Sequence, residues 1–229
     1  MKLTLVKKVE EARNTKSFYF KPEEPLQWIP GQYIYITLPK LNYPDERGLT
    51  RHFTIASSPT EKDLIQITTR IREQSGYKKT LDKLPIGSFV EAKDPNGMFI
   101  LDQKIKNNIF IAGGIGITPF RSMIKYNIDK KLNLSMYLIY SNSDNQFVFK
   151  KELDNWTNNN ENIKIRYFDS SISGHLDTNK LSSFLSDQKI QNSTFWVVGP
   201  NPFVDAIEML LEELKIPEDN IKTEKFTGY

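Results

Sequence analysis

Residues 108–119 read NIFIAGGIGITP, an apolar run that ends in closely spaced glycines and a proline. A short apolar run before a turn is typical of a buried strand, and proline is favoured in the first turn of a helix. Glycines between the two let a phosphate approach the helix N-terminus, whose amides and dipole favour an anion. The segment therefore predicts a strand, a phosphate-binding turn and a helix. Pro119 stands where the full dinucleotide motif has its third glycine, so an ordinary tight turn is the alternative.

Downstream of this segment, strand patterns alternate with helical patterns. Expected strands cover residues 134–140, 163–168, 194–198 and 221–225, and expected helices cover 119–126, 148–156, 177–185 and 202–214. Asp177 is expected to cap its helix. Such alternation predicts a parallel sheet with helices on both faces and ligands at the carboxyl ends of its strands. Gly199-Pro200 ends one strand and is either a second ligand-binding turn or a turn tightened by proline.

Upstream of residue 103, short runs of strand character are separated by turns rich in proline and glycine. Expected strands cover residues 2–9, 17–20, 33–38, 53–56, 64–70 and 88–92, and one helical pattern covers 77–84. Several short strands with this punctuation predict a small barrel or sandwich. Tyr33 and Tyr35 alternate in one strand and are expected in its core. We therefore expect two domains, residues 1–103 and 104–229.

The composition excludes several classes of site and partner. The 229 residues include no cysteine and two histidines, so no disulfide, cysteine-ligated cluster or multi-histidine metal site is expected, and redox chemistry needs an organic cofactor. The net charge of +3 lies on residues 1–103, with 16 basic and 13 acidic residues, and does not predict a nucleic-acid partner. No apolar run is long enough for a membrane span or a signal peptide, so a cytoplasmic protein is expected.

Arg51-His52-Phe53-Thr54 places a cation, an aromatic ring and a hydroxyl on one extended segment. In a strand, Arg51 and Phe53 share one face, and a strand with one exposed charge is the plain interpretation. Together with the glycine turn, Gly199-Pro200 and the ending EKFTGY at 224–229, however, the segment resembles the ferredoxin–NADP reductase superfamily of flavoproteins. The motifs follow the family's order over essentially the whole chain. The resemblance implies a six-stranded antiparallel Greek-key barrel that binds flavin, followed by an α/β domain that binds NAD(P)H.

The resemblance also implies roles for residues of the barrel. Arg51 would bind the flavin pyrophosphate, Phe53 would pack on the isoalloxazine where the family usually has tyrosine, and Thr54 would offer its hydroxyl near N5. Residues 75–81, SGYKKTL, resemble a family segment in which a helix N-terminus meets the flavin phosphates. There Lys78 and Lys79 either add positive charge or form a solvated helix face. The other flavin contacts expected in this part are His52, Thr69, Ile71 and Gly76.

In the second domain, the resemblance implies contacts with the dinucleotide and cover for the flavin. Thr118 would lie close to both cofactors, and Glu224 would relay protons or steady the ring. Phe226 would cover the flavin until nicotinamide displaces it, with Tyr229 as a competitor and core packing as the alternative. Thr54, Thr118, Glu224 and Phe226 are thus the expected catalytic residues. The other expected contacts here are Gly113, Gly114, Gly116, Pro119, Ser141, Asn142, Gly199 and Pro200.

The implied function is an FAD-dependent NAD(P)H oxidoreductase that passes electrons to a separate acceptor, such as a ferredoxin, a flavodoxin or a small molecule. Such carriers are often acidic, so the positive excess on residues 1–103 would steer them. Ser143 stands where many NADP-specific members have arginine, and Lys150 or Lys151 could replace it, so the choice between NADH and NADPH stays open. The alternatives are FMN in place of FAD, reduction of free flavin, and a reductase subunit of an oxygenase or other complex without independent turnover.

Overall fold

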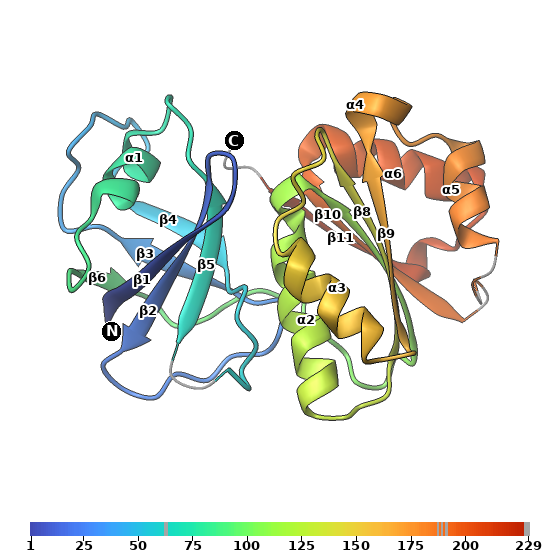
Figure 1. Ribbon diagram of the computed structural model, residues 1–229, viewed down its shortest axis with the longest axis horizontal. Helices are drawn as coiled ribbons and strands as arrows, with labels where there is room; N and C mark the ends of the chain where they lie inside the picture. Colours follow the sequence, from blue (N-terminus) through green and yellow to red (C-terminus); the bar gives the residue numbers. More distant parts are fainter. Residues whose placement is uncertain (62–63, 187, 189, 191, 227–229) are drawn as a thin grey trace. The chain divides into compact units, whose positions relative to one another are not determined.

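The computed structural model describes residues 1–61, 64–186, 188, 190 and 192–226 (Figure 1). The chain divides into two compact units. The first comprises Met1–Leu101 and Arg121–Tyr126, and the second comprises Asp102–Phe120 and Asn127–Tyr229. Within the described ranges, no helix has both the length and the apolar character needed to cross a membrane.

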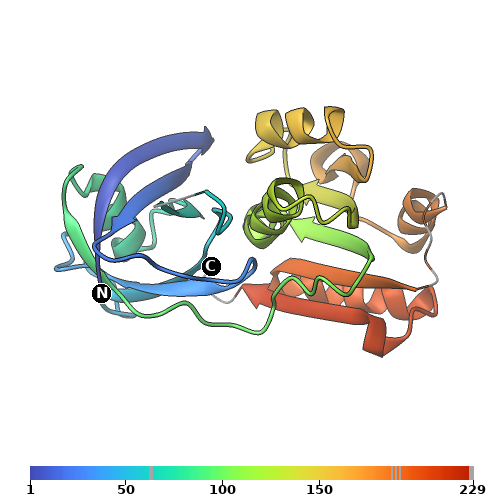
Figure 2. The same ribbon diagram turned by 90° about the horizontal axis from the view of Figure 1, so that it is seen from below.

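The first unit is a six-stranded antiparallel sheet that curls into a barrel (Figure 2). An antiparallel bridge between Ile55 and Ile67 joins the end of β4 to β5, the two outermost strands, so both edges of the sheet are partnered there. The expected six-stranded antiparallel barrel is confirmed. The strands lie across the sheet in the order β4-β3-β6-β1-β2-β5. Along the chain they are β1 (Lys2–Ala12), β2 (Thr15–Pro22), β3 (Tyr33–Thr37), β4 (Thr50–Thr54), β5 (Ile65–Arg70) and β6 (Phe89–Ala92).

The barrel core is formed by alternate strand residues and by one helix, α1 (Gly76–Lys83). In β3 the core residues are Ile34 and Ile36, whereas Tyr33 and Tyr35 are partly exposed on the opposite face. The expectation that the two tyrosines are core residues is therefore wrong. When isoleucine and tyrosine alternate, burying the isoleucines leaves the phenolic hydroxyls in contact with water.

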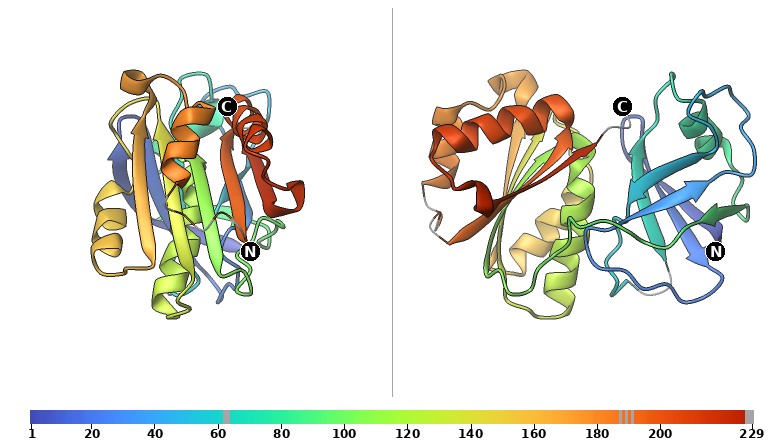
Figure 3. Two further views of the ribbon diagram at one scale, coloured as in Figure 1. Left: turned by 90° about the vertical axis from the view of Figure 1, so that its right-hand side faces the viewer. Right: turned by 180° about the vertical axis from the view of Figure 1, so that it is seen from behind.

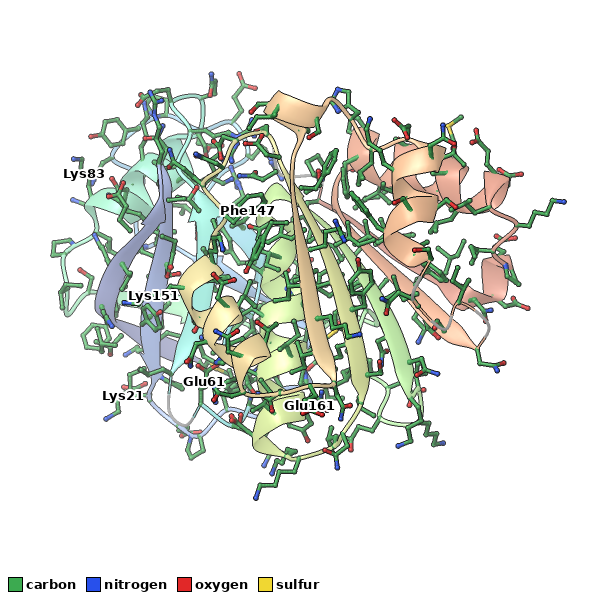
Figure 4. All side chains as sticks on the ribbon, turned by 45° about the vertical axis from the view of Figure 1, so that its right-hand side comes forward. Lys21, Glu61, Lys83, Phe147, Lys151 and Glu161 are labelled. Atoms are coloured by element: carbon green, nitrogen blue, oxygen red, sulfur yellow. The ribbon has the colours of Figure 1, made fainter. Side chains whose placement is uncertain are left out.

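Residues of helix α2 complete the first unit. The Arg121 guanidinium binds both carboxylate oxygens of Glu61, which is labelled in Figure 4, at 2.8 and 3.0 Å, and the carbonyl oxygen of Ala56 at 2.8 Å. The Ser122 hydroxyl donates to the carbonyl oxygen of Ser57 at 2.8 Å. Bidentate pairs of this kind are among the stronger side-chain contacts, and here they fix the segment that follows β4.

The second unit is a five-stranded parallel sheet with helices on both faces (Figure 3), as expected. On one face, Leu181 and Val204 pack with Ile109 and its neighbours, and on the other Phe110 stacks on Phe120 with ring centroids 4.5 Å apart. The strands lie across the sheet in the order β11-β10-β7-β8-β9. Along the chain they are β7 (Asn107–Gly113), β8 (Ser135–Asn142), β9 (Ile163–Asp169), β10 (Ser193–Pro200) and β11 (Ile221–Phe226).

The helices of the second unit begin close to the predicted positions. The Asp177 carboxylate accepts from the Lys180 amide at 2.9 Å, which confirms the predicted N-cap. One short helix, α4, is absent from the predicted pattern, because four residues carry no periodicity. The helices are α2 (Ile117–Asp129), α3 (Lys150–Asn158), α4 (Ser170–Ser173), α5 (Thr178–Leu185) and α6 (Asn201–Glu213), with short 3-10 turns at Gly114–Gly116 and Glu218–Asn220.

Candidate functional site

Positive charge is concentrated at the N-terminus of α1. Lys78 is buried, and its pKa is lowered to about 8, first by burial and then by the charges of Arg72, Arg47, Arg51 and Arg70. The first turn of a helix adds amides that have no carbonyl partner within the helix, and the positive end of the dipole. Five cations and a helix N-terminus in one place fit a group with several negative charges, such as the diphosphate of FAD.

One carboxylate lies among these cations. Asp45 accepts from the amides of Tyr77 at 2.9 Å and Arg47 at 3.1 Å, from the Ser75 hydroxyl at 3.1 Å and from the Arg51 guanidinium. Burial opposes ionisation of Asp45, but these hydrogen bonds and the Arg51 charge outweigh it and lower its pKa. Sequence reasoning missed Asp45, because an acidic residue in a turn next to proline carries no signal of its own.

The backbone around Asp45 packs closely on α1. A Cβ atom at Gly76 would lie 2.1 Å from the carbonyl oxygen of Pro44 and 2.5 Å from that of Tyr43. Only glycine at position 76 therefore lets residues 43–45 approach the helix N-terminus. The predicted flavin contact at Gly76 lies directly under this segment.

β4 begins at Thr50, whereas the sequence predicted a start near Phe53, so Arg51 is part of the strand. Its guanidinium donates to the carbonyl oxygens of Arg47, Gly48 and Thr50 at 2.8, 3.1 and 2.7 Å. The side chain is 8% exposed. Binding of a pyrophosphate by Arg51 stays a prediction, and the residue already has an anionic partner in Asp45.

The other expected flavin contacts lie on two faces of the barrel wall. Phe53 is a core residue whose ring lies 5.9 Å from that of Tyr77. On the opposite face, the centroid of the His52 ring lies 5.3 and 5.7 Å from those of Tyr33 and Tyr35. His52 remains partly exposed, and partial loss of hydration and the charge of a nearby arginine lower its pKa. Among the remaining candidates, Thr54 and Thr69 are buried, Ile71 is half-buried, and Lys79 lies 3.8 Å from Glu73 and over the ring of Tyr43.

In the second unit, the glycine turn lies at the carboxyl ends of β7 and β10. A Cβ at Gly116 would lie 2.4 Å from the carbonyl oxygen of Val198, and Gly113 and Gly199 are both held against the ring of Phe203. Gly114 has a φ of +55°. Pro119 lies in the first turn of α2, as predicted. Thr118 is buried, and its hydroxyl donates to the carbonyl oxygen of Ile115 at 3.1 Å, which stabilises the turn itself.

The end of β8 lies beside this turn. The side-chain oxygen of Asn142 lies 3.7 Å from a Cβ built on Gly114, and the Asn142 amide donates to the Asp144 carboxylate at 2.7 Å. Neighbouring Ser141 is also buried. Asp144, which sequence reasoning missed, is therefore an acidic group held at the edge where the dinucleotide is expected.

An aromatic cluster follows on the chain. The ring of Phe147, labelled in Figure 4, contacts those of Tyr140 and Tyr167 at 5.1 and 4.9 Å. The ammonium group of Lys150 lies 4.2 Å from the centroid of the Tyr167 ring and binds the Asp154 carboxylate at 2.6 Å. Lys150 is thus already paired with a carboxylate.

The last strand carries the two predicted catalytic residues of the C-terminus. Glu224 pairs with Val198, and Phe226 pairs with Pro200 beside the second glycine turn. Burial raises the pKa of Glu224 to about 7, and its Oε2 atom has no hydrogen-bond partner among the described residues. Phe226 is half-buried. Tyr229, the competing residue, lies outside the described residues, and the roles of Glu224 and Phe226 stay predictions.

Comparison with known proteins assigns each unit. The family model of an oxidoreductase FAD-binding domain matches residues 2–100, and that of an oxidoreductase NAD-binding domain matches 110–209. Flavohemoprotein A of Dictyostelium discoideum is 30% identical over 96% of this chain, and the glycine betaine monooxygenase reductase subunit of Pseudomonas aeruginosa is 24% identical over 90% of it. The chain spans 58% and 59% of the length of these two relatives.

The fold also has solved counterparts. The FAD/NAD-binding domain of a nitric oxide dioxygenase from Vibrio cholerae superposes with a TM-score of 0.82, at 18% identity and over 98% of both chains. This likeness shows the two-domain fold. Because an FAD-binding model and an NAD-binding model match its two halves in that order, the chain belongs to the ferredoxin–NADP reductase superfamily of flavin-dependent oxidoreductases.

Proposed function

We propose that this chain is the reductase module of an electron-transfer system: it takes hydride from NADH onto FAD and passes electrons to a separate acidic electron carrier. Bound FAD would supply a group that accepts hydride and returns electrons one at a time. The observation that carries the proposal is the cluster of five cations at the N-terminus of α1, within the part of the chain that matches the FAD-binding model.

The choice of FAD over FMN is supported by the FAD-binding family model that matches residues 2–100. Lys78 and the four arginines around it would face both phosphates of the FAD diphosphate. Arg51 and the first-turn amides of α1 would bind the diphosphate, and Thr54 would orient the ring system. Glu224, whose pKa burial raises to about 7, would gain or lose a proton near neutral pH.

The choice of NADH over NADPH is supported by the charges at the ends of β8 and β9. Asp144 lies two residues after the end of β8, and Asp169 ends β9 at the position paired with Asn142. A carboxylate there accepts a hydrogen bond from a ribose 2′-hydroxyl but repels a 2′-phosphate. The two lysines that could counter this charge are poorly suited, because Lys150 binds Asp154 and Lys151 is exposed on α3 (Figure 4).

A separate acceptor is supported by the relatives and by the sequence. The glycine betaine monooxygenase relative is named as a reductase subunit, so it serves an oxygenase. This chain has no cysteine with which to hold an iron–sulfur cluster of its own. The acceptor we propose is an acidic carrier protein, which the net positive charge of residues 1–103 would attract at low ionic strength.

The experiment is reconstitution of the purified chain with FAD or FMN, followed by anaerobic mixing with NADH or NADPH. We expect a flavin absorption spectrum with FAD and faster bleaching by NADH than by NADPH. An FAD-loaded protein that neither pyridine nucleotide reduces would contradict the proposal. Reduction of an added acidic carrier, with a rate that falls as salt is raised, tests the last step.

A second candidate, reduction of free flavin as a substrate, is favoured by one observation. Arg51 is enclosed by its own loop and paired with Asp45, which would weaken the hold on a diphosphate. Gel filtration of the reconstituted protein distinguishes the two. Flavin that stays with the protein supports a cofactor, and flavin that separates while turnover continues supports a substrate.

A further inference from the structure

Two groups expected to bind the flavin diphosphate both bind one residue of the chain itself. The Arg51 guanidinium donates to one carboxylate oxygen of Asp45, and the Tyr77 amide, in the first turn of α1, donates to the other at 2.9 Å. The Ser75 hydroxyl reaches that second oxygen at 3.1 Å. Asp45 thus makes the contacts that a phosphate would make at this helix N-terminus.

The arrangement also limits access to these groups. A diphosphate can bind only those groups that it can reach. The Arg51 side chain is 8% exposed and the Asp45 side chain 7%. Above them, the carbonyl groups of Tyr43 and Pro44 approach Gly76 so closely that a Cβ would not fit. A diphosphate cannot reach Arg51 and the α1 amides together while residues 43–45 lie there.

We propose that Asp45 is an internal competitor for the flavin diphosphate, and that residues 43–48 move aside when FAD binds. The inference rests on the proposed function, because it takes FAD as the ligand of this site. It adds a residue that no sequence motif indicated, and it assigns that residue a role opposite to that of a binding residue.

The balance of charge and packing suits such an exchange. Asp45 brings one negative charge to the place where five cations gather, and a diphosphate brings more. The loop is held mainly by its contacts with Arg51 and α1, and Asn42, Pro44, Glu46 and Leu49 are exposed. A ligand that takes over the contacts of Asp45 would therefore loosen the loop. Once displaced, the Asp45 carboxylate would be hydrated by water, whereas the four cations outside residues 43–48 would keep an anionic partner.

The first test is the FAD affinity of Asp45→Asn, measured by quenching of flavin fluorescence on titration of the flavin-free protein. Asparagine keeps the shape of aspartate but loses the charge that binds Arg51. We expect FAD to bind roughly tenfold more tightly, because one charge-assisted contact no longer competes. Asp82→Asn is the matched control. It removes a carboxylate of α1 that binds Lys16 at 2.6 Å, and it should leave FAD affinity unchanged.

The second test needs no variant and therefore decides the matter if Asp45→Asn fails to fold. Hydrogen exchange of residues 43–48 is compared in the wild-type chain with and without FAD. Faster exchange of this segment on binding supports displacement of the loop, and slower or unchanged exchange overturns it.

The remaining outcomes separate this inference from the function on which it rests. If both proteins bind FAD and Asp45→Asn binds it equally or more weakly, Asp45 positions Arg51 for the ligand and the inference is overturned while the function stands. If neither protein binds FAD, the proposed function itself is overturned, and the inference with it.

Discussion

Gly116 lies against the carbonyl oxygen of Val198, at a place where a Cβ atom would come within 2.4 Å of it. The contact joins the turn after β7 to the end of β10, where Gly199 is the next residue of the strand. Because the close approach requires the absence of a side chain, glycine at position 116 is needed for the packing of the turn on β10, in addition to any role in binding a ligand. The two glycine turns thereby share one edge of the parallel sheet.

Gly116→Ala should therefore weaken both the fold and the binding of NADH. The added methyl group forces the turn away from β10, at a cost of about 1–3 kcal/mol in the free energy of unfolding. Urea unfolding measures this cost, and steady-state kinetics should show a raised KM for NADH. The control is Gly174→Ala, which meets open space at a φ of +69° and should cost only backbone strain, with KM unchanged. Equal effects of the two variants on KM would contradict the assignment.

Thr54→Ala should slow reduction of the flavin by NADH roughly tenfold while the affinity for FAD stays the same. The reason is the loss of one hydroxyl expected near the reacting atom of the flavin, a contact whose deletion is worth a little over 1 kcal/mol. Anaerobic stopped-flow absorbance gives the rate, and Thr54→Ser, which keeps the hydroxyl, should retain most of it. A reduction rate that does not change in Thr54→Ala would remove this residue from the catalytic set.

Phe226→Ala should bind NAD⁺ more tightly if the Phe226 ring covers the flavin and nicotinamide must displace that ring. The variant no longer has to move an aromatic group before binding, so we expect the dissociation constant of NAD⁺ to fall several-fold. Isothermal titration of the FAD-loaded protein measures it. Unchanged affinity together with a lower melting temperature would identify Phe226 as a packing residue, the alternative reading of this position.

Glu224 should make stability depend on pH in a defined direction. Its pKa is about 7 in the folded protein against an ordinary value of 4.5, so the folded state holds the proton more tightly. Its contribution is fully present below about pH 4.5 and is lost as pH rises through 7. Relative to Glu224→Gln, the wild-type chain should lose about 2 kcal/mol in the free energy of unfolding between pH 5 and pH 8.

Urea unfolding of both proteins at the two pH values tests the role of Glu224. Glu212→Gln, which changes an exposed residue of α6, should keep the wild-type pH dependence. Parallel pH profiles for wild type and Glu224→Gln would show that the buried carboxylate does not govern stability in this range.

Asp144→Ser should narrow the proposed preference for NADH over NADPH by about tenfold, since one carboxylate would no longer repel the 2′-phosphate. The ratio of kcat/KM for the two nucleotides is the measurement. Glu161→Gln, which changes an exposed carboxylate before the start of β9, serves as the comparison. A ratio that does not move in Asp144→Ser would place the ribose elsewhere.

The fold could be predicted largely because periodicity records it. The alternation of short strands before residue 103 and of strands with helices after it reflects which residues enter each core, and the Asp177 cap is a local hydrogen bond. Tyr33 and Tyr35 show where the pattern misleads. In β3 isoleucine and tyrosine alternate, so hydrophobicity alone does not say which face is buried.

The site was predicted less completely, because its charges come from segments far apart in the chain. Lys78 was visible as part of a motif, but its pKa is lowered by burial and by the charges of four arginines that lie elsewhere in the chain. Asp45 was missed because a carboxylate acquires its role only when folding brings it to α1. Sequence patterns indicate residues that bind a ligand, and give no signal for a residue that occupies the ligand's place.

The packing of Arg121 on Glu61 has a consequence for synthesis. Residues of the first unit are not contiguous, since Arg121–Tyr126 follows about twenty residues after Leu101, where the first stretch of that unit ends. The barrel segment leaving the ribosome must therefore wait for part of α2 before the Glu61 carboxylate finds its partner. A polypeptide that ended at Leu101 would lack Arg121 and therefore the partner of Glu61.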